Sequence, residues 1–233
     1  MGESLQGQVA IVTGANGGLG TYVTNALLAA GATVVGIARS NAAGEAHDNR
    51  FYPVSADLTN PQEVQNHVVR LAEQFGKIDI LVHVMGGFAG GSSIAATDDA
   101  TWRKMMDLNL NAAFYVFRAV VPVMRAAGHG RIIAIASRQA VQPAANVGAY
   151  SASKAALVSL VQTVALEGKD KGIRANVILP GTMDTSANRA AMPKANFAKW
   201  VNPSHVAELV LMLTGDAGGD ITGAAIPIYG ADQ

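Results

Sequence analysis

Short, nearly continuous apolar runs alternate along the chain with longer segments of helical spacing. Apolar strands without polar alternation are typical of a sheet that is buried on both faces. Because strands alternate with helices, right-handed crossovers are expected, which predicts one α/β domain over residues 1–233 with a doubly wound parallel sheet of seven strands. The predicted strands cover residues 8–14, 32–38, 50–58, 77–86, 131–137, 173–181 and 224–230. The predicted helices cover residues 19–31, 61–76, 98–128 (two joined helices), 150–172 and 204–214.

One connection departs from this alternation. The segment SNAAGEAHDNR, residues 40–50, joins the second predicted strand to the third and is polar and rich in small side chains. Parallel strands usually need a crossover helix. Here the composition favours a loop instead.

The composition excludes several classes of function. The formal net charge is zero and only 15% of residues are charged, so no electrostatic attraction to nucleic acid or to an acidic membrane is expected. The absence of cysteine excludes disulfides, thiolate metal sites and a cysteine nucleophile. The five histidines are scattered without metal-ligand spacing, so no metal site is expected. The N-terminus lacks the apolar run of a signal peptide and no apolar stretch is expected to cross a bilayer, which predicts a cytoplasmic protein.

A glycine-rich turn, VTGANGGLGTY, lies between the first predicted strand and the first helix. Its glycines at 14, 17, 18 and 20 allow the backbone to approach a pyrophosphate, and the N–H groups of the helix N-terminus favour its negative charge. A glycine pattern alone is weak, and an ordinary turn is the alternative. The position after the first strand favours nucleotide binding.

Two further positions bear on the nucleotide. Asp57 follows the third predicted strand, where its carboxylate could accept a hydrogen bond from an adenine amino group; the alternative is a turn or helix-start aspartate. Arg39 and Ser40 end the second predicted strand. NAD sites usually carry an acidic residue at this place, whereas arginine suits the 2′-phosphate of NADP. The sequence therefore favours NADP(H), with NAD(H) possible and a solvated strand-end charge as the alternative.

Tyr150 and Lys154 are four residues apart in a predicted helix and are therefore neighbours on its surface. A nearby ammonium lowers the pKa of a phenol, which would allow Tyr150 to exchange a proton with a carbonyl or carbinol oxygen. An incidental surface pair is the alternative. Ser137 ends the fifth predicted strand, at the sheet edge where ligands bind in open α/β folds, and its hydroxyl could contact the same substrate oxygen. A serine that merely ends the strand is the alternative there.

These segments, together with NL at 109–110 and PGTMDT at 180–185, give the chain a specific resemblance to a known family. In order and spacing the set resembles the short-chain dehydrogenases/reductases, over about residues 7–230. The resemblance implies a Rossmann fold and a hydride-transfer enzyme for a small-molecule carbonyl or alcohol. Members are usually homotetramers or homodimers that pair through two long helices, here 109–128 and 150–171.

The resemblance also implies roles for individual residues. Tyr150 would be the acid/base, Ser137 would orient the substrate, and Lys154 would lower the pKa of Tyr150 and hold the nicotinamide ribose. Asn109 would hold a water that relays protons to Lys154, although it could instead be a simple helix irregularity, with Asn111 a weaker candidate. The Met183 backbone and the Thr185 hydroxyl would lie near the carboxamide. The expected cofactor-binding set is Gly14, Asn16, Gly17, Gly18, Leu19, Gly20, Arg39, Ser40, Asp57, Leu58, Val84, Met85, Gly86, Tyr150, Lys154, Pro180, Gly181, Met183 and Thr185.

The chain departs from the family pattern after the fourth strand, where NNAG is replaced by HVMGG (83–87). The glycines can still wall the adenosine, but the support that the asparagines give to the strand must come from elsewhere. VMGGFAGG (84–91), residues 184–200 and the short 40–50 connection resemble dihydropteridine reductase. That branch generally lacks the serine and prefers NADH, so Ser137 and Arg39 argue for a general carbonyl reductase.

Three functions stay open at this point. The favoured one is an NADP(H)-dependent oxidoreductase of ketones or secondary alcohols, with 3-oxoacyl, pterin and small-ketone reduction unresolved and a dihydropteridine-reductase-like enzyme as the alternative. A non-catalytic nucleotide sensor is a different class, against which the Ser–Tyr–Lys set argues. A nucleic-acid-binding module would need a basic face. Residues 182–203 are long and irregular, which predicts a substrate lid carrying Met192, Phe197 and Trp200; a static surface segment or an oligomer contact is the alternative.

Overall fold

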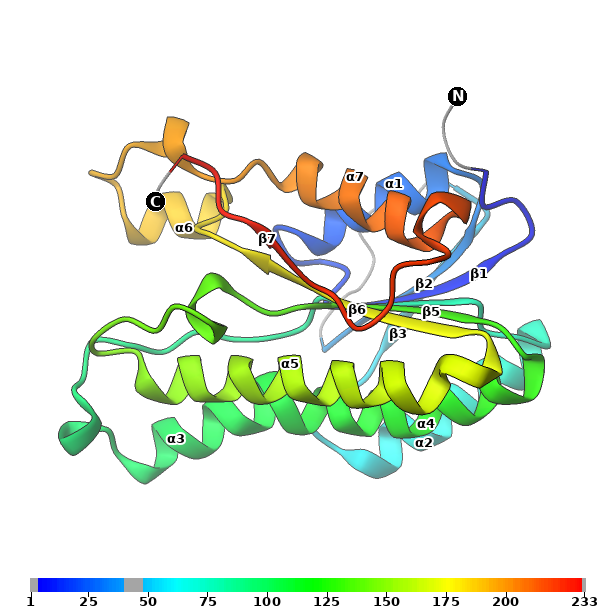
Figure 1. The fold of residues 1–233 in the computed structure, drawn as a ribbon, viewed down its shortest axis with the longest axis horizontal. Helices are drawn as coiled ribbons and strands as arrows, with labels where there is room; N and C mark the ends of the chain where they lie inside the picture. The colour runs from blue at the N-terminus through cyan, green and yellow to red at the C-terminus, as the bar shows by residue number, and fades with distance from the viewer. Residues whose placement is uncertain (1–3, 40–47, 232–233) are drawn as a thin grey trace.

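Seven parallel strands form one sheet in the order β3-β2-β1-β4-β5-β6-β7, which confirms the predicted doubly wound α/β fold (Figure 1). The structure is a computed structural model and describes residues 4–39 and 48–231. The strands are β1 (Val9–Thr13), β2 (Thr33–Ala38), β3 (Phe51–Ser55), β4 (Ile80–His83), β5 (Gly130–Ile135), β6 (Ile173–Pro180) and β7 (Ala225–Ile228). The 40–47 part of the predicted loop lies outside the described residues.

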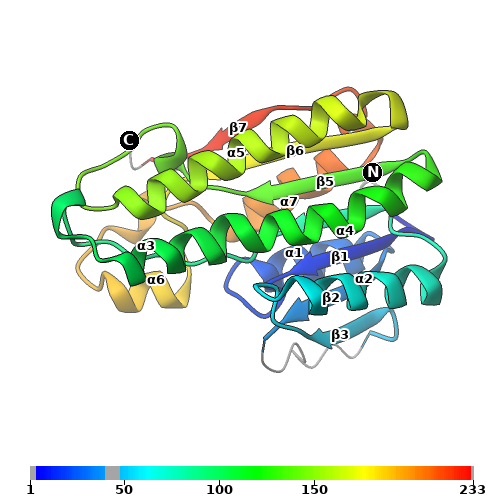
Figure 2. The same ribbon diagram turned by 90° about the horizontal axis from the view of Figure 1, so that it is seen from below.

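Helices cover both faces of the sheet. On one face lie α2 (Pro61–Phe75), α4 (Ala112–Ala127) and α5 (Gly148–Gly168), which run side by side in the view from below (Figure 2). On the other lie α1 (Gly20–Ala29) and α7 (Pro203–Thr214) (Figure 1). Each face buries its own apolar cluster, one against α2, α4 and α5 and the other against α1 and α7. A single sheet therefore separates two layers of one core, as expected for a single domain.

Burial explains why the strands lack a polar alternation. Every residue of β1 and β4 is buried, because both of their faces are covered by helices. Among residues 4–39 and 48–231, β3 pairs only with β2, and it is half-buried to exposed along its length. This edge position allows Pro53 within a strand, since its missing N–H costs no ladder hydrogen bond on the open side.

Local signals set the bounds of α2. The Asn60 side chain accepts hydrogen bonds from the backbone N–H groups of Gln62 (3.0 Å) and Glu63 (3.3 Å), and Pro61 occupies the first helical position. Gly76 ends the helix in the left-handed region at φ 73°. The predicted helix over 61–76 is confirmed.

The run predicted as two joined helices is continuous. α3 (Asp99–Met106) passes into a π-helical turn, η2 (Asp107–Asn111), and then into α4. Such turns insert a residue into an α-helix and occur frequently at functional sites. This turn carries Asn109, which is fully buried.

The helical run Asp99–Ala127 is long and apolar enough, by length and composition alone, to cross a membrane. The expectation that no apolar stretch reaches this limit is therefore wrong for this segment. Its residues Val116, Val120 and Met124 are buried in the core cluster against the sheet. Packing on the sheet explains the apolar composition, because core helices pass the same test.

Several predicted boundaries shift by a few residues. The fourth strand was predicted over 77–86 but β4 ends at His83, because the following backbone bonds to side chains and not to a neighbouring strand. The helix predicted from Tyr150 begins at Gly148 and gives way at Lys169 to a short 3-10 turn, η4 (Lys169–Lys171). The remaining short elements are η1 (Ile94–Ala96), η3 (Arg138–Ala140), α6 (Ser186–Ala191), η5 (Phe197–Lys199) and η6 (Asp216–Gly218).

Candidate active site

The glycine turn at the carboxyl end of β1 is too tight for side chains at Gly14 and Gly20. Gly14 has φ 68°, and a Cβ on it would lie 3.0 Å from the backbone N of Met85. A Cβ on Gly20 would lie 2.0 Å from the carbonyl oxygen of Gly14. The turn thus brings the start of α1 directly against the ends of β1 and β4.

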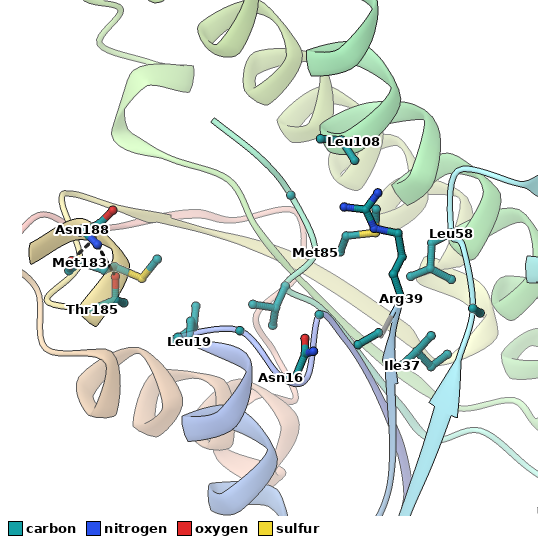
Figure 3. A pocket seen from close by; sticks show the side chains of 17 residues that line it. Asn16, Leu19, Ile37, Arg39, Leu58, Met85, Leu108, Met183, Thr185 and Asn188 are labelled. Atoms are coloured by element: carbon teal, nitrogen blue, oxygen red, sulfur yellow. Dashed lines mark hydrogen bonds between the residues drawn. The ribbon is translucent and has the colours of Figure 1, made fainter. Parts of the chain in front are cut away.

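A cavity of about 450 Å³ opens over this turn (Figure 3). Its volume lies within the usual range of small-molecule sites. Most of the sequence-predicted cofactor residues line it: Gly14, Asn16, Gly17, Gly18, Leu19, Arg39, Leu58, Val84, Met85, Gly86, Met183 and Thr185. Five lining residues were missed: Ile37, Ala38, Ala56, Leu108 and Asn188.

The segment after β6 closes one side of the cavity. A Cβ on Gly18 would lie 2.9 Å from Cγ2 of Thr185, so this glycine lets the segment approach the turn. Thr185 caps α6 by accepting from the Asn188 N–H (3.3 Å), and Asn188 Nδ2 donates to the Met183 carbonyl (2.8 Å). A capping box would have Glu or Gln at this position, so no sequence signal marks Asn188.

Six described members of the predicted cofactor set do not line the cavity: Gly20, Asp57, Tyr150, Lys154, Pro180 and Gly181. Gly20 has the packing role described above. Pro180 ends β6, and Gly181 donates its N–H to the Ile228 carbonyl (2.9 Å). A Cβ on Gly181 would lie 2.5 Å from the carbonyl oxygen of Tyr229, so the glycine allows the ends of β6 and β7 to pass closely.

Arg39 leaves the end of β2 and extends along the cavity between Met85 and Leu58 (Figure 3). The side chain is exposed, and the Arg39 carbonyl accepts from the Ser55 hydroxyl (3.0 Å), which ties the end of β2 to β3. The cation therefore stands at the cavity wall, as predicted. Ser40 lies outside the described residues.

Asp57 forms a turn. Its Oδ1 accepts from the backbone N–H (2.9 Å) and the hydroxyl (2.7 Å) of Thr59, and these bonds hold the pKa of the carboxyl below its usual value. These contacts are those of a turn aspartate, which is the alternative role that the sequence allows for Asp57. Asp57 does not line the cavity, although Leu58 does, and its hydrogen bond to an adenine stays a prediction.

Tyr150 lies half-buried in the first turn of α5, and a hydrogen bond joins its phenol to the Ser137 hydroxyl at the end of β5. Burial raises the pKa of Tyr150, while the Ser137 hydrogen bond acts in the opposite direction. The structure thus brings these two residues together at the carboxyl edge of the sheet, and their catalytic roles stay a prediction.

Lys154 is only 4% exposed, and its Nζ donates to the Ile135 carbonyl (2.9 Å). Burial lowers the pKa of Lys154 to about 8. The net shift in the pKa of Tyr150 is thus opposite to the lowering predicted from the sequence, because burial of the phenol dominates. Lys154 also reaches the glycines after β4, since a Cβ on Gly86 would lie 3.0 Å from its Nζ.

Asn109 connects the π-helical turn to these glycines. Its Oδ1 accepts from the Gly87 N–H (2.9 Å), and its Nδ2 donates to the Gly87 carbonyl and to the Ser153 hydroxyl (3.0 Å each). The helix irregularity considered as an alternative is therefore real and accompanies the polar contacts. Asn111 bonds instead to Asp107 (2.8 Å), away from this network. The water relay through Asn109 stays a prediction.

The support that β4 was expected to need comes from β1. Thr13 Oγ1 accepts from the Met85 N–H (3.2 Å) and bonds to Nδ1 of His83 (3.0 Å). His83 is fully buried, and burial, followed by the nearby Lys154 charge, lowers the pKa of its imidazole to about 3. A neutral imidazole thus helps to hold the chain where it turns toward the cavity.

The segment 182–203 is anchored at its base and open at its tip. Asp184 N–H donates to the Val201 carbonyl and Val201 N–H to the Thr182 carbonyl (2.8 Å each). Trp200 is 9% exposed and packs on Phe197, with ring centroids 4.8 Å apart. Because the fold already buries Trp200, this side chain is not available to a substrate in this arrangement, contrary to the prediction. Met192 is 42% exposed and stays available.

Residues 8–196 match the family model described as short chain dehydrogenase. The chain belongs to the short-chain dehydrogenase family. A short chain dehydrogenase/reductase of Aspergillus oryzae, astE, is 31% identical to it over 97% of this chain and 94% of its own. The 3-oxoacyl-(acyl-carrier-protein) reductase FabG of Escherichia coli is 27% identical over 97% of this chain and 98% of its own. The crystal structure of gox2181 is similar with a TM-score of 0.91 and 31% identity, covering 97% of this chain and 95% of that one.

Short-chain dehydrogenases are oxidoreductases that use nicotinamide cofactors, NAD(P)(H), act on small molecules and are commonly oligomeric. The residues of this chain fit such a cofactor. Gly17, Gly18 and Leu19 line the cavity where α1 begins, and a Cβ on Gly18 would lie 2.9 Å from the Thr185 side chain. The N-terminus of a helix favours an anionic group such as a pyrophosphate. Gly86 also lines this cavity, and a Cβ on it would lie 3.0 Å from the Lys154 ammonium.

Proposed function

We propose that this short-chain dehydrogenase is an NADP(H)-dependent oxidoreductase that interconverts a carbonyl compound and a secondary alcohol, with Tyr150 as the acid/base. The observation that carries the proposal is the hydrogen bond between Tyr150 and Ser137 at the same sheet edge as the glycine-lined cavity. The bound cofactor supplies or accepts the hydride.

The protein side of the reaction is a proton transfer. Ser137 and Tyr150 offer two hydroxyl groups to one substrate oxygen, which fixes its position. Because burial raises the pKa of Tyr150, the phenol is protonated near neutral pH and can donate its proton to a carbonyl oxygen. In the direction of alcohol oxidation, Tyr150 must first lose that proton. Lys154 would contact the ribose and return a proton to Tyr150.

Arg39 supports the preference for NADP(H). Its exposed guanidinium stands at the cavity wall beside Leu58, where a 2′-phosphate could accept from it. A charge-assisted hydrogen bond of this kind contributes about 1.5–3 kcal/mol, which is roughly 10- to 150-fold in affinity.

The surroundings of Tyr150 support a partly apolar substrate. The Phe88 ring is 67% exposed and meets the Tyr150 ring edge-to-face at 5.0 Å, and Ile94 is 70% exposed. Residues 182–203 would close over such a substrate as a lid, with the exposed Met192 facing it. The substrate itself, among 3-oxoacyl thioesters, pterins and small ketones, is left to the test below.

We also propose that the protein forms a homotetramer or homodimer in the cytoplasm, pairing through α4 and α5. Phe114 on α4 is 42% exposed and lies beneath the Arg118 guanidinium, 5.2 Å from its ring centroid. Leu166 on α5 is 78% exposed. Exposed large apolar groups on two neighbouring helices are suited to an interface.

The test is a screen of ketones, 3-oxoacyl thioesters and quinonoid dihydropterin, each with NADPH and with NADH, on the wild type and on Tyr150→Phe. The variant should bind NADPH as the wild type does, yet lose most of its turnover, because only the proton donor is removed. Tyr115→Phe is the matched control, since this phenol lies on α4. Near-normal turnover in Tyr150→Phe would remove Tyr150 from the mechanism.

A further inference from the structure

The Ser137 hydroxyl has a second side-chain partner besides Tyr150. Its Oγ donates to Oε1 of Gln139 and accepts from the Gln139 backbone N–H (3.3 Å). Ser137 is 6% exposed and caps the start of η3, so residue 139 is held where its side chain can reach back. Sequence reasoning gave Gln139 no role.

Counting protons fixes the direction of the hydrogen bonds. A serine hydroxyl has one proton, and an amide oxygen can only accept. While the proton of Ser137 points to Gln139 Oε1, the hydrogen bond with Tyr150 must be donated by the phenol. This arrangement favours the protonated form of Tyr150, because it withholds from the phenolate the Ser137 hydrogen bond that would lower the pKa.

The reverse direction needs only a turn of the amide. Oxygen and nitrogen of a glutamine amide occupy nearly equal volumes, so a 180° rotation exchanges acceptor for donor with little repacking. With Nε2 toward Ser137, Gln139 donates, and the hydroxyl proton of Ser137 becomes available to the phenolate. Hydrogen bonds to a charged acceptor are the stronger ones, so this second arrangement stabilises deprotonated Tyr150.

We propose that the Gln139 side-chain amide is a positioning group that decides whether Ser137 accepts from Tyr150 or donates to it. The proposal rests on the proposed function for the role of Tyr150. In carbonyl reduction the O–H bond of the phenol breaks, its electron pair stays on the phenolate oxygen, and the proton forms the carbinol O–H bond. As the Gln139 amide turns, the Ser137 O–H bond stays intact, and its hydrogen bond is redirected from Gln139 to the phenolate.

The other ionisable groups around this part of α5 are the same in the wild type and in any variant at position 139. They are Lys154 on α5 itself, Arg138 in η3, Asp107 in η2 and His83 at the end of β4. None of them is changed by substitutions at position 139. Differences between variants therefore report on the Gln139 contact.

The test is a pH titration of Tyr150 in the protein without substrate or cofactor. The protonation of its phenol is monitored by NMR of the ring carbons in protein that carries labelled tyrosine. The chain has five tyrosines, and Tyr150→Phe identifies the resonance. Gln139→Met removes the competing acceptor and keeps the side-chain volume, so the pKa of Tyr150 should fall by about half a unit to one unit. Gln139→Leu repeats the change if the Met variant does not fold.

Gln139→Glu offers an acceptor that cannot turn into a donor and should raise the pKa of Tyr150. Gln142→Glu is the matched control, because Gln142 is exposed on the same segment and adds the same charge without the Ser137 contact. An unchanged pKa in both apolar variants, or equal shifts in the two Glu variants, would overturn the proposal. Because no substrate is used, a protein without carbonyl reductase activity could still show these shifts, which keeps the two proposals separable.

Discussion

Replacing Asn109 with alanine should destabilise the protein more than an ordinary polar substitution. The amide makes four hydrogen bonds from a fully buried position: two to the backbone of Gly87, one to Ser153 and a weak one to the sulfur of Met105 (3.8 Å). Ser153 keeps its bond to the Tyr150 carbonyl (2.8 Å), but Gly87 loses both partners. The Gly86–Gly87 backbone beside Lys154 then has no fixed position.

The magnitude follows from these contacts. Each buried hydrogen bond contributes about 1 kcal/mol, and a buried group left without a partner costs about 1–3 kcal/mol. Gly87 is half-buried, so water replaces part of the loss. We expect Asn109→Ala to lower the free energy of unfolding by about 2–4 kcal/mol.

The assay is urea denaturation at a fixed protein concentration, since oligomers couple stability to concentration. Asn111→Ala is the control: it lies in the same π-helical turn, and its one side-chain bond, to Asp107, is exposed. Its loss should be within about 0.5 kcal/mol. Equal losses in the two variants would refute the reasoning, because they would show that the contacts to Gly87 contribute nothing.

Three further outcomes are expected. Arg39→Asp should reverse the cofactor preference toward NAD(H), and equal affinities of the wild type for NADPH and NADH, measured by calorimetry, would contradict the assignment. The imidazole of His83 takes up a proton on unfolding (pKa 6.5) but resists it when folded (pKa about 3), so stability should fall by about 2 kcal/mol between pH 7 and pH 5; His83→Asn should flatten this slope, and an unchanged slope would show that His83 does not cause it. Hydrogen exchange over residues 184–200 should slow when NADPH is added, whereas strong protection before the addition would argue for a static segment.

The sequence predicted the fold well because burial on both faces leaves an apolar signal in the central strands. β1 and β4 are buried throughout and apolar up to their last residues, Thr13 and His83. The glycines between β1 and α1 mark a turn that passes too close to Met85 for a side chain at Gly14. The structure also brings together Ser137 and Tyr150, whose joint role the family resemblance implies, since both lie at element ends on one edge of the sheet.

The energetics of the site could not be predicted in the same way. A spacing of four residues places Lys154 beside Tyr150 but says nothing of how deeply each is buried, and burial reversed the expected pKa shift of the phenol. Asn188 and Leu108 were missed because they reach the cavity only through the tertiary path of α6 and η2. Gln139 was missed because its contact depends on the turn that follows β5.

Because of the π-helical turn η2, the number of residues between α3 and α4 decides where Asn109 lies. Each residue of an α-helix turns the axis by about 100°. Deleting one residue from 107–111 would therefore leave a regular helix of better local geometry, yet rotate α3 relative to α4 by that angle and withdraw Asn109 from Gly87. Among variants of this chain, single-residue deletions should be tolerated in the exposed stretch 186–196 far better than here, even though both segments are helical in part.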